Sequence, residues 1–113
     1  MEKRKVDKAH INLMVYNETA GNPELLSDGH VPYFCWDRNL TVADIHKNLH
    51  TFTDNRRTMF IAWLMREAAF QDVWYFLTPE QVCNNMPKVE FALGRKRNFW
   101  KFIMGKWHEL GKI

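Results

Sequence analysis

The sequence predicts a mostly α domain of four or five short helices, preceded by an irregular or single-strand N-terminal arm. Three observations predict this fold: helix-capping residues recur from Thr41 onward, apolar residues follow them at helical spacing, and turn-forming residues separate the segments. A length of 113 residues fits one domain. We therefore expect residues 1–32 to form the arm and residues 33–113 the helical domain.

The arm has the weakest pattern in the chain. Apolar residues alternate from Ile11 to Val15, which fits a short strand, although the wider stretch from Val6 to Tyr16 could also be a helix. Gly21-Asn22-Pro23 then indicates a turn. We expect this arm to be loosely packed and to be a segment that a partner could order.

The first two helices of the domain have clear starting points. Thr41 and Asp44 resemble a capping arrangement for a helix that ends near Leu49. Thr53-Asp54 predicts the start of a second helix that reaches about Phe70. Because this second helix is apolar almost all round, we expect it to be central and buried.

Three shorter segments follow. A third helix is predicted over Asp72–Leu77, and Thr78-Pro79 with Gln81 predicts the start of a fourth. This fourth helix should stop near Met86, because Pro87 disfavours a helical residue before it. A short turn over 88–93 then leads to a last helix over 98–110. Its predicted apolar stripe is Phe99, Ile103, Trp107 and Leu110, with Trp100 and Met104 beside it.

Aromatic residues are frequent, with five Trp and eight Phe in the chain. Aromatic side chains supply much core area per residue and are also enriched at protein interfaces. We expect core packing for most of them. The segment that opens the helical domain, together with later aromatics, is interpreted as a structural box made of Tyr33, Phe34, Trp36, Asp37, Trp74, Phe99 and Trp100.

Charge is unevenly distributed along the chain. Residues 9–87 hold five basic and nine acidic residues, whereas residues 88–113 hold seven basic residues and two acidic ones. A basic end of this kind suits an acidic protein partner or a nucleic acid, and a solvated helix face is the alternative interpretation. The candidate partner-binding residues are Arg95, Lys96, Arg97, Lys101 and Lys106.

The residues expected of an enzyme are not found together in the sequence. His46 and His50 have a spacing that places two imidazoles on one helix face, but a zinc site needs further ligands. Cys35 lies between two aromatic residues, and a catalytic thiol needs a neighbouring base. We therefore expect no enzyme activity, no metal, no cofactor and no small-molecule substrate.

The sequence also bears on location. Its longest apolar run, Met59–Met65, is far too short to cross a bilayer, so no membrane partner is expected. Basic residues near the N-terminus are not followed by the apolar region of a secretory signal. Cys35 and Cys83 are far apart and are expected to be thiols rather than a disulfide. A cytoplasmic protein is the expectation.

The order of these motifs resembles a group of small bacterial "FWD-box" helical proteins encoded beside nucleotidyltransferase-like toxins of the abortive-infection type. The resemblance covers about residues 33–107, and Cys35 in the box and the longer arm depart from the pattern. It implies an antitoxin-like role through contact with a protein partner. The residues that carry it are Tyr33-Phe34-x-Trp36-Asp37, Asn55-Arg56-Arg57, Arg66-Glu67, Asp72-Val73-Trp74 and Arg97-Asn98-Phe99-Trp100.

Three functions therefore remain open from the sequence. The first is a non-enzymatic interaction module that binds and restrains a toxin enzyme through the basic C-terminal helix and the arm. The second is a nucleic-acid-binding regulator that uses the same basic helix. The third is a phage-encoded inhibitor of a host defence complex, which would also bind a protein partner.

Overall fold

The computed structural model describes residues 22–111, and these form five α-helices and three short 3-10 segments. No strand occurs within this range, which confirms the mostly α prediction; the strand expected over 11–15 lies outside the described residues. The elements in order are η1 Pro23–Leu26, α2 Val42–Thr51, α3 Asp54–Glu67, α4 Phe70–Phe76, α5 Pro79–Val89, η2 Glu90–Ala92, η3 Gly94–Lys96 and α6 Arg97–Glu109.

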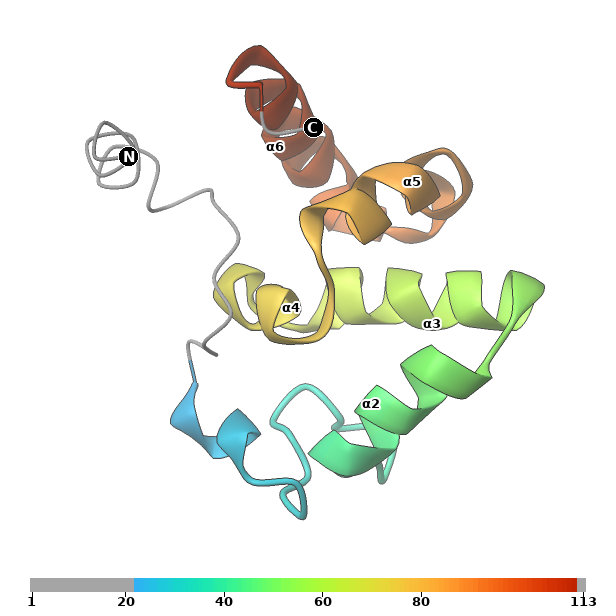
Figure 1. Ribbon diagram of the computed structural model, residues 1–113, viewed down its shortest axis with the longest axis vertical. Helices are drawn as coiled ribbons and strands as arrows, with labels where there is room; N and C mark the ends of the chain where they lie inside the picture. The colour runs from blue at the N-terminus through green and yellow to red at the C-terminus, as the bar shows by residue number, and fades with distance from the viewer. Residues whose placement is uncertain (1–21, 112–113) are drawn as a thin grey trace.

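Helix α3 is the centre of the fold, as its apolar sequence predicts. All six residues from Phe60 to Met65 are buried, because neighbouring elements cover α3 on several sides. Figure 1 shows α2 on one side of α3 and α5 with α6 on the other, while α4 lies near the end at which α3 stops. Helices α2, α4 and α5 and the segments η2 and η3 pack directly against α3.

Two predicted helix starts are confirmed in detail. At α2, the Thr41 hydroxyl accepts the Asp44 N–H at 3.1 Å, and the Asp44 carboxylate accepts the Thr41 N–H at 3.0 Å. At α5, Thr78 and Gln81 make the same reciprocal pair at 3.2 and 2.8 Å. The start of α3 differs, because the Thr53 side chain makes no capping bond among the described residues.

The second predicted helix ends earlier than expected. Helix α3 stops at Glu67 rather than near Phe70, and α4 begins at Phe70 rather than at Asp72. The reason lies in the backbone N–H of Ala69, which donates to the Tyr33 hydroxyl at 2.8 Å instead of continuing the helical ladder. A tyrosine from a distant segment thus separates α3 from α4.

The predicted stop of α5 before Pro87 is wrong. The helix runs through Pro87 to Val89. Proline lacks the N–H that would bond four residues back, but Met86 and Val89 on the same helix are buried against the core. Burial of this apolar face holds the last turn in place where the local preference of the residue before proline opposes it.

The inward face of α6 is also shifted from the prediction. Trp100, Ile103 and Trp107 are buried, whereas Phe99 and Leu110, which were expected in the stripe, are about two-fifths exposed. The spacing of the three buried residues still follows one helix face. The predicted and observed stripes share Ile103 and Trp107. They differ at the adjacent pair Phe99-Trp100, where Trp100 rather than Phe99 faces the core.

The described part of the arm, residues 22–32, is attached to the helical domain, which corrects the expectation of loose packing for these residues. Leu25 of η1 is fully buried in the same core as the helices. The backbone N–H groups of Val42 and Ala43, in the first turn of α2, donate to the carbonyls of His30 and Asp28 at 2.9 and 3.0 Å. Burial of one leucine and pairing of helix-end donors therefore fix this segment.

Candidate functional site

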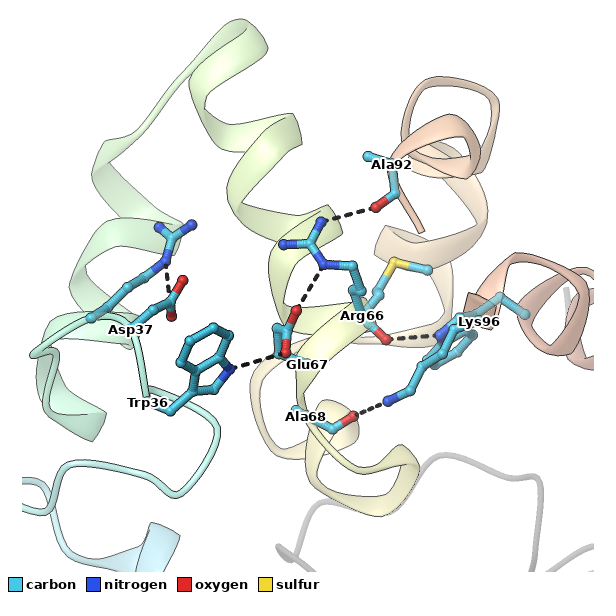
Figure 2. A network of polar contacts seen from close by, with 10 residues as sticks. Trp36, Asp37, Arg66, Glu67, Ala68, Ala92 and Lys96 are labelled. Atoms are coloured by element: carbon cyan, nitrogen blue, oxygen red, sulfur yellow. Dashed lines mark hydrogen bonds and ion pairs between the residues drawn. The ribbon is translucent and has the colours of Figure 1, made fainter. Parts of the chain in front are cut away.

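Two motifs separated by about sixty residues in the sequence meet at the C-terminal end of α3. From the aromatic box, the Trp36 indole N–H donates to Glu67 at 3.4 Å. From the basic segment, the Lys96 ammonium donates to the Ala68 carbonyl at 3.0 Å, and Figure 2 shows the two contacts on either side of the chain that leaves α3. A cation at this position is favourable because the carbonyl end of a helix carries partial negative charge.

Arg66 extends this network toward η2. Its guanidinium donates to Glu67 at 2.8 Å and to the Ala92 carbonyl at 3.0 Å, and both bonds are visible in Figure 2. Arg66 and Trp36 therefore share the Glu67 carboxylate. The pKa of Glu67 is lowered, chiefly by the bond from Arg66. The network ties three segments together and is structural in character.

Tyr33 links the same junction to the described part of the arm. Its hydroxyl donates to Asp72 at 2.6 Å, and the other carboxylate oxygen of Asp72 accepts the Asn22 N–H at 2.9 Å. Burial, followed by the bond to Asp72, raises the pKa of Tyr33 to about 12. Sequence reasoning assigned Asp72 only to a helix start, whereas its side chain connects two distant segments.

The expected structural box divides into three buried residues and four exposed ones, the exposed ones being Tyr33, Trp36, Asp37 and Phe99. Phe34, Trp74 and Trp100 are buried, so these three residues pack in the core. Trp36 does not: its side chain is 77% exposed, which corrects its assignment as a structural anchor. Asp37 is also exposed, and its carboxylate lies 3.9 Å from the Arg38 guanidinium, within ion-pair distance.

The five basic residues predicted to bind a partner do not form one free row. Lys96 is turned toward Ala68, and burial lowers its pKa. Arg97 bonds Glu90 at 3.0 Å, and Lys106 lies 3.5 Å from Glu109. Arg95 and Lys101 are exposed. Lys96 is therefore engaged within the chain, and Arg97 and Lys106, each about two-fifths exposed, lie in surface ion pairs.

A different surface emerges where the loop of residues 36–40 runs along α3 in the opposite direction. Trp36 contacts Glu67 near the end of α3, and the Arg38 guanidinium lies over the Trp63 ring at 4.5 Å one helical turn earlier. Further back, Leu40 borders the same depression as Phe60. The α3 residues in this line are Arg56, Phe60, Trp63 and Glu67, which share one helix face by their spacing.

Between this loop, α2 and α3 lies an open cleft of about 550 Å³. We call it the arginine cleft and define it by its lining residues, Arg38, Leu40, Asn48, Phe52, Arg56, Met59 and Phe60. The lining has two guanidinium groups and no carboxylate. Sequence reasoning missed this cleft, although the i, i+4, i+7 spacing of Arg56, Phe60 and Trp63 places them on one face.

His46 and Cys35 occupy structural positions, whereas His50 is exposed. His46 packs against Tyr75 and Phe76, with ring centroids 5.4 and 5.0 Å apart, and burial lowers its pKa. Cys35 is nearly fully buried, and burial raises the pKa of its thiol, which opposes thiolate formation. Within residues 22–111, no three potential metal ligands gather at one place.

Two broader findings complete the description. None of the described helices is both long and apolar enough to cross a membrane. Comparison with protein-family models, with curated proteins and with solved structures gave no match.

Proposed function

We propose that the chain is a non-enzymatic protein-interaction module, an antitoxin-like partner that binds and restrains a toxin enzyme in the cytoplasm. One observation carries the proposal: Trp36 projects into solvent with 77% of its surface exposed, in the same loop that supplies Arg38 and Leu40 to the arginine cleft. A tryptophan gains much from burial, and tryptophan with arginine is typical of the residues that dominate binding energy at protein interfaces.

The surroundings of Trp36 support an interface. Arg38 follows it closely in the loop, and its guanidinium is already fixed over the Trp63 ring. Met59, on the face of α3 that borders the cleft, is about half exposed. A partner that covers this surface would bury an aromatic residue, a flexible apolar residue and two arginines together, with little side-chain ordering still required at Arg38.

The nucleic-acid alternative is less well supported by the same contacts. Three of the five cations on which it depends have partners within the described chain, namely Ala68, Glu90 and Glu109. Strong nucleic-acid binding needs several cations that can all contact phosphate. A protein partner requires only a local, complementary surface, which the loop and α3 provide.

The choice of a toxin enzyme as the partner rests on the resemblance of the sequence motifs. A chain that inhibits a defence complex would be a second form of the same protein–protein interaction. Both require a stoichiometric protein partner. The free thiols of Cys35 and Cys83 agree with a cytoplasmic setting. Identification of the partner therefore distinguishes the two forms.

The test is a pull-down of the tagged chain from its native cells, with and without nuclease, followed by identification and quantification of the captured proteins. The wild-type chain should retain one nuclease-resistant partner in stoichiometric amount. Trp36→Ala should lose it. Phe102→Ala is the matched control, because Phe102 is 56% exposed on α6, which Figure 1 shows on the opposite side of α3 from α2.

Each outcome has a clear meaning. A partner with toxin activity that the purified chain suppresses would support the proposal, and a defence complex as partner would select its second form. Loss of the partner in Phe102→Ala but not in Trp36→Ala would move the interface to α6. Nuclease-sensitive recovery, with no stoichiometric protein, would contradict the proposal.

A further inference from the structure

The rings of Phe52 and Phe60 in the arginine cleft continue to Trp63, which lies outside the lining. Three rings form a row in which Phe52 contacts Phe60 edge to face at 5.4 Å and Phe60 stacks on Trp63 at 5.3 Å. A guanidinium lies at each end of this row: Arg56 over Phe52 at 3.9 Å, and Arg38 over Trp63 at 4.5 Å. The rings thus hold two positive groups on opposite sides of an apolar strip.

The guanidinium groups of Arg38 and Arg56 have N–H donors that could still bind a ligand. Arg38 meets Asp37 only at 3.9 Å, with both side chains 42% exposed. Arg56 is exposed, and no carboxylate within residues 22–111 forms an ion pair with it. A guanidinium that stacks on a ring keeps its N–H edge free, and this edge matches a carboxylate in a two-point contact.

The apolar part of the cleft lies between these cations. Phe60 is 4% exposed and serves as floor, while Met59 is 49% exposed and Leu40 half-buried at the border. Methionine is flexible and adapts to different apolar side chains. The surface therefore suits a ligand with an apolar side chain flanked by negative groups.

The same contacts disfavour a nucleic acid here. Binding of single strands uses aromatic faces on which bases stack. In this row of rings, Arg56 covers Phe52, Arg38 covers Trp63, and Trp63 is 1% exposed. Because the ring faces are already occupied, carboxylates on a peptide fit the cleft better than phosphates with attached bases.

We propose that the arginine cleft binds an acidic peptide segment of the partner protein, with carboxylates at Arg38 and Arg56 and an apolar side chain over Met59 and Phe60. This inference rests on the proposed function, since it names the part of the partner that the interaction surface would hold. Recognition by two separated charges also favours a peptide of defined spacing over a general polyanion.

The test measures binding of fluorescent synthetic peptides to the full chain. One probe alternates leucine with pairs of Asp and Glu, a second replaces all acids with Asn and Gln, and a third is a single-stranded DNA of equal charge. The wild-type chain should bind the acidic peptide at least about tenfold more tightly than the other two, which corresponds to about 1.4 kcal/mol.

Two variants locate the binding. Arg38→Gln with Arg56→Gln should weaken acidic-peptide binding by about tenfold or more, whereas Lys88→Gln, a control at an exposed lysine of α5 outside the cleft, should leave it unchanged. Met59→Glu is a second variant that keeps both stacked arginines, and its added charge should repel the acidic peptide. Circular dichroism verifies that each variant is folded.

Equal binding of the neutral peptide, tighter binding of the DNA, or full binding by Arg38→Gln with Arg56→Gln would overturn the inference. Its failure can be told apart from failure of the proposed function. Capture of a partner that needs Trp36 but neither arginine would contradict only the acidic-peptide inference. Specific peptide binding without any stoichiometric partner in cells would contradict only the proposed function.

Discussion

The indole N–H of Trp100 donates to the carbonyl oxygen of Met65 at 3.0 Å and so joins α6 to the last turn of α3. Met65 needs this donor because the N–H of Ala69, four residues on, bonds the Tyr33 hydroxyl instead. Trp107 lies two turns further along α6, is equally buried at 1% exposure, and has no partner for its N–H among the described residues. The two tryptophans are equally buried, but only Trp100 has a hydrogen-bond partner for its indole N–H.

We therefore expect Trp100→Phe to lower the free energy of unfolding more than Trp107→Phe does. Both changes remove the same ring atoms from the core, but only the first leaves a buried carbonyl without its donor. The difference should be about 1–2 kcal/mol. Urea unfolding of the two variants side by side provides the measurement, and equal losses of stability would show that the Trp100 bond contributes nothing.

Leu25 and Leu26 test whether the described part of the arm belongs to the domain. Leu25 is fully buried, whereas its neighbour Leu26 is 60% exposed. Leu25→Ala should therefore lower the free energy of unfolding by about 2–4 kcal/mol, as for other core leucines. Leu26→Ala, the adjacent control, should stay within about 0.5 kcal/mol of the wild-type chain.

The readout for this pair is thermal or urea unfolding of the full chain. A cooperative transition whose midpoint falls only in Leu25→Ala would confirm that η1 unfolds with the helices. If neither variant changes the midpoint, η1 detaches before the rest of the domain unfolds.

Pro87 lies inside α5 and is exposed. Because proline has no backbone N–H, the helix lacks one internal hydrogen bond at this position. The Pro87 side chain is exposed, so its burial does not offset that loss. Pro87→Ala should raise the free energy of unfolding by about 1 kcal/mol or more, since alanine restores the donor and favours helix. A drop in stability, measured by urea unfolding, would show that the rigid proline helps to end the helix correctly.

Much of the fold could be predicted from local chemistry. The two capping boxes at Thr41 and Thr78 are short-range patterns, so their positions in the sequence define where α2 and α5 begin. The all-round apolar stretch within Phe60–Met65 likewise predicted a central helix. Such features depend on neighbouring residues only.

The predictions were wrong where contacts between residues far apart in the sequence determine the local structure. The end of α3 depends on Tyr33, thirty-six positions away from Ala69, and no local pattern contains that bond. The continuation of α5 through Pro87 depends on burial against other elements. The candidate site shows the same limit: the charges of Lys96 and Arg97 are visible in the sequence, but their partners Ala68 and Glu90 are set by the fold.

The arginine cleft escaped prediction for a related reason. Arg38 and Arg56 lie eighteen positions apart, in separate segments of the sequence. Only the path of the loop along α3 brings them to one row of rings. Trp36 shows the opposite case, because an aromatic residue inside an aromatic segment suggests burial while the loop turns it outward.

Tyr33 makes stability depend on pH in the alkaline range. Its pKa rises from 10.0 to about 12 in the folded chain, chiefly through burial and then through the bond to Asp72. The folded state therefore holds this proton more tightly than the unfolded state. The resulting stabilisation is fully present below pH 10 and is lost as the pH rises through about 12.

The free energy of unfolding should fall across this window, and Tyr33→Phe should remove that part of the decline. Because other tyrosines and lysines titrate nearby, the informative quantity is the difference between the two profiles, measured by urea unfolding at each pH. Ultraviolet titration of tyrosinate in both proteins serves as the independent control. Parallel profiles, or ionisation of Tyr33 near its ordinary pKa, would contradict the Tyr33–Asp72 bond as a source of stability.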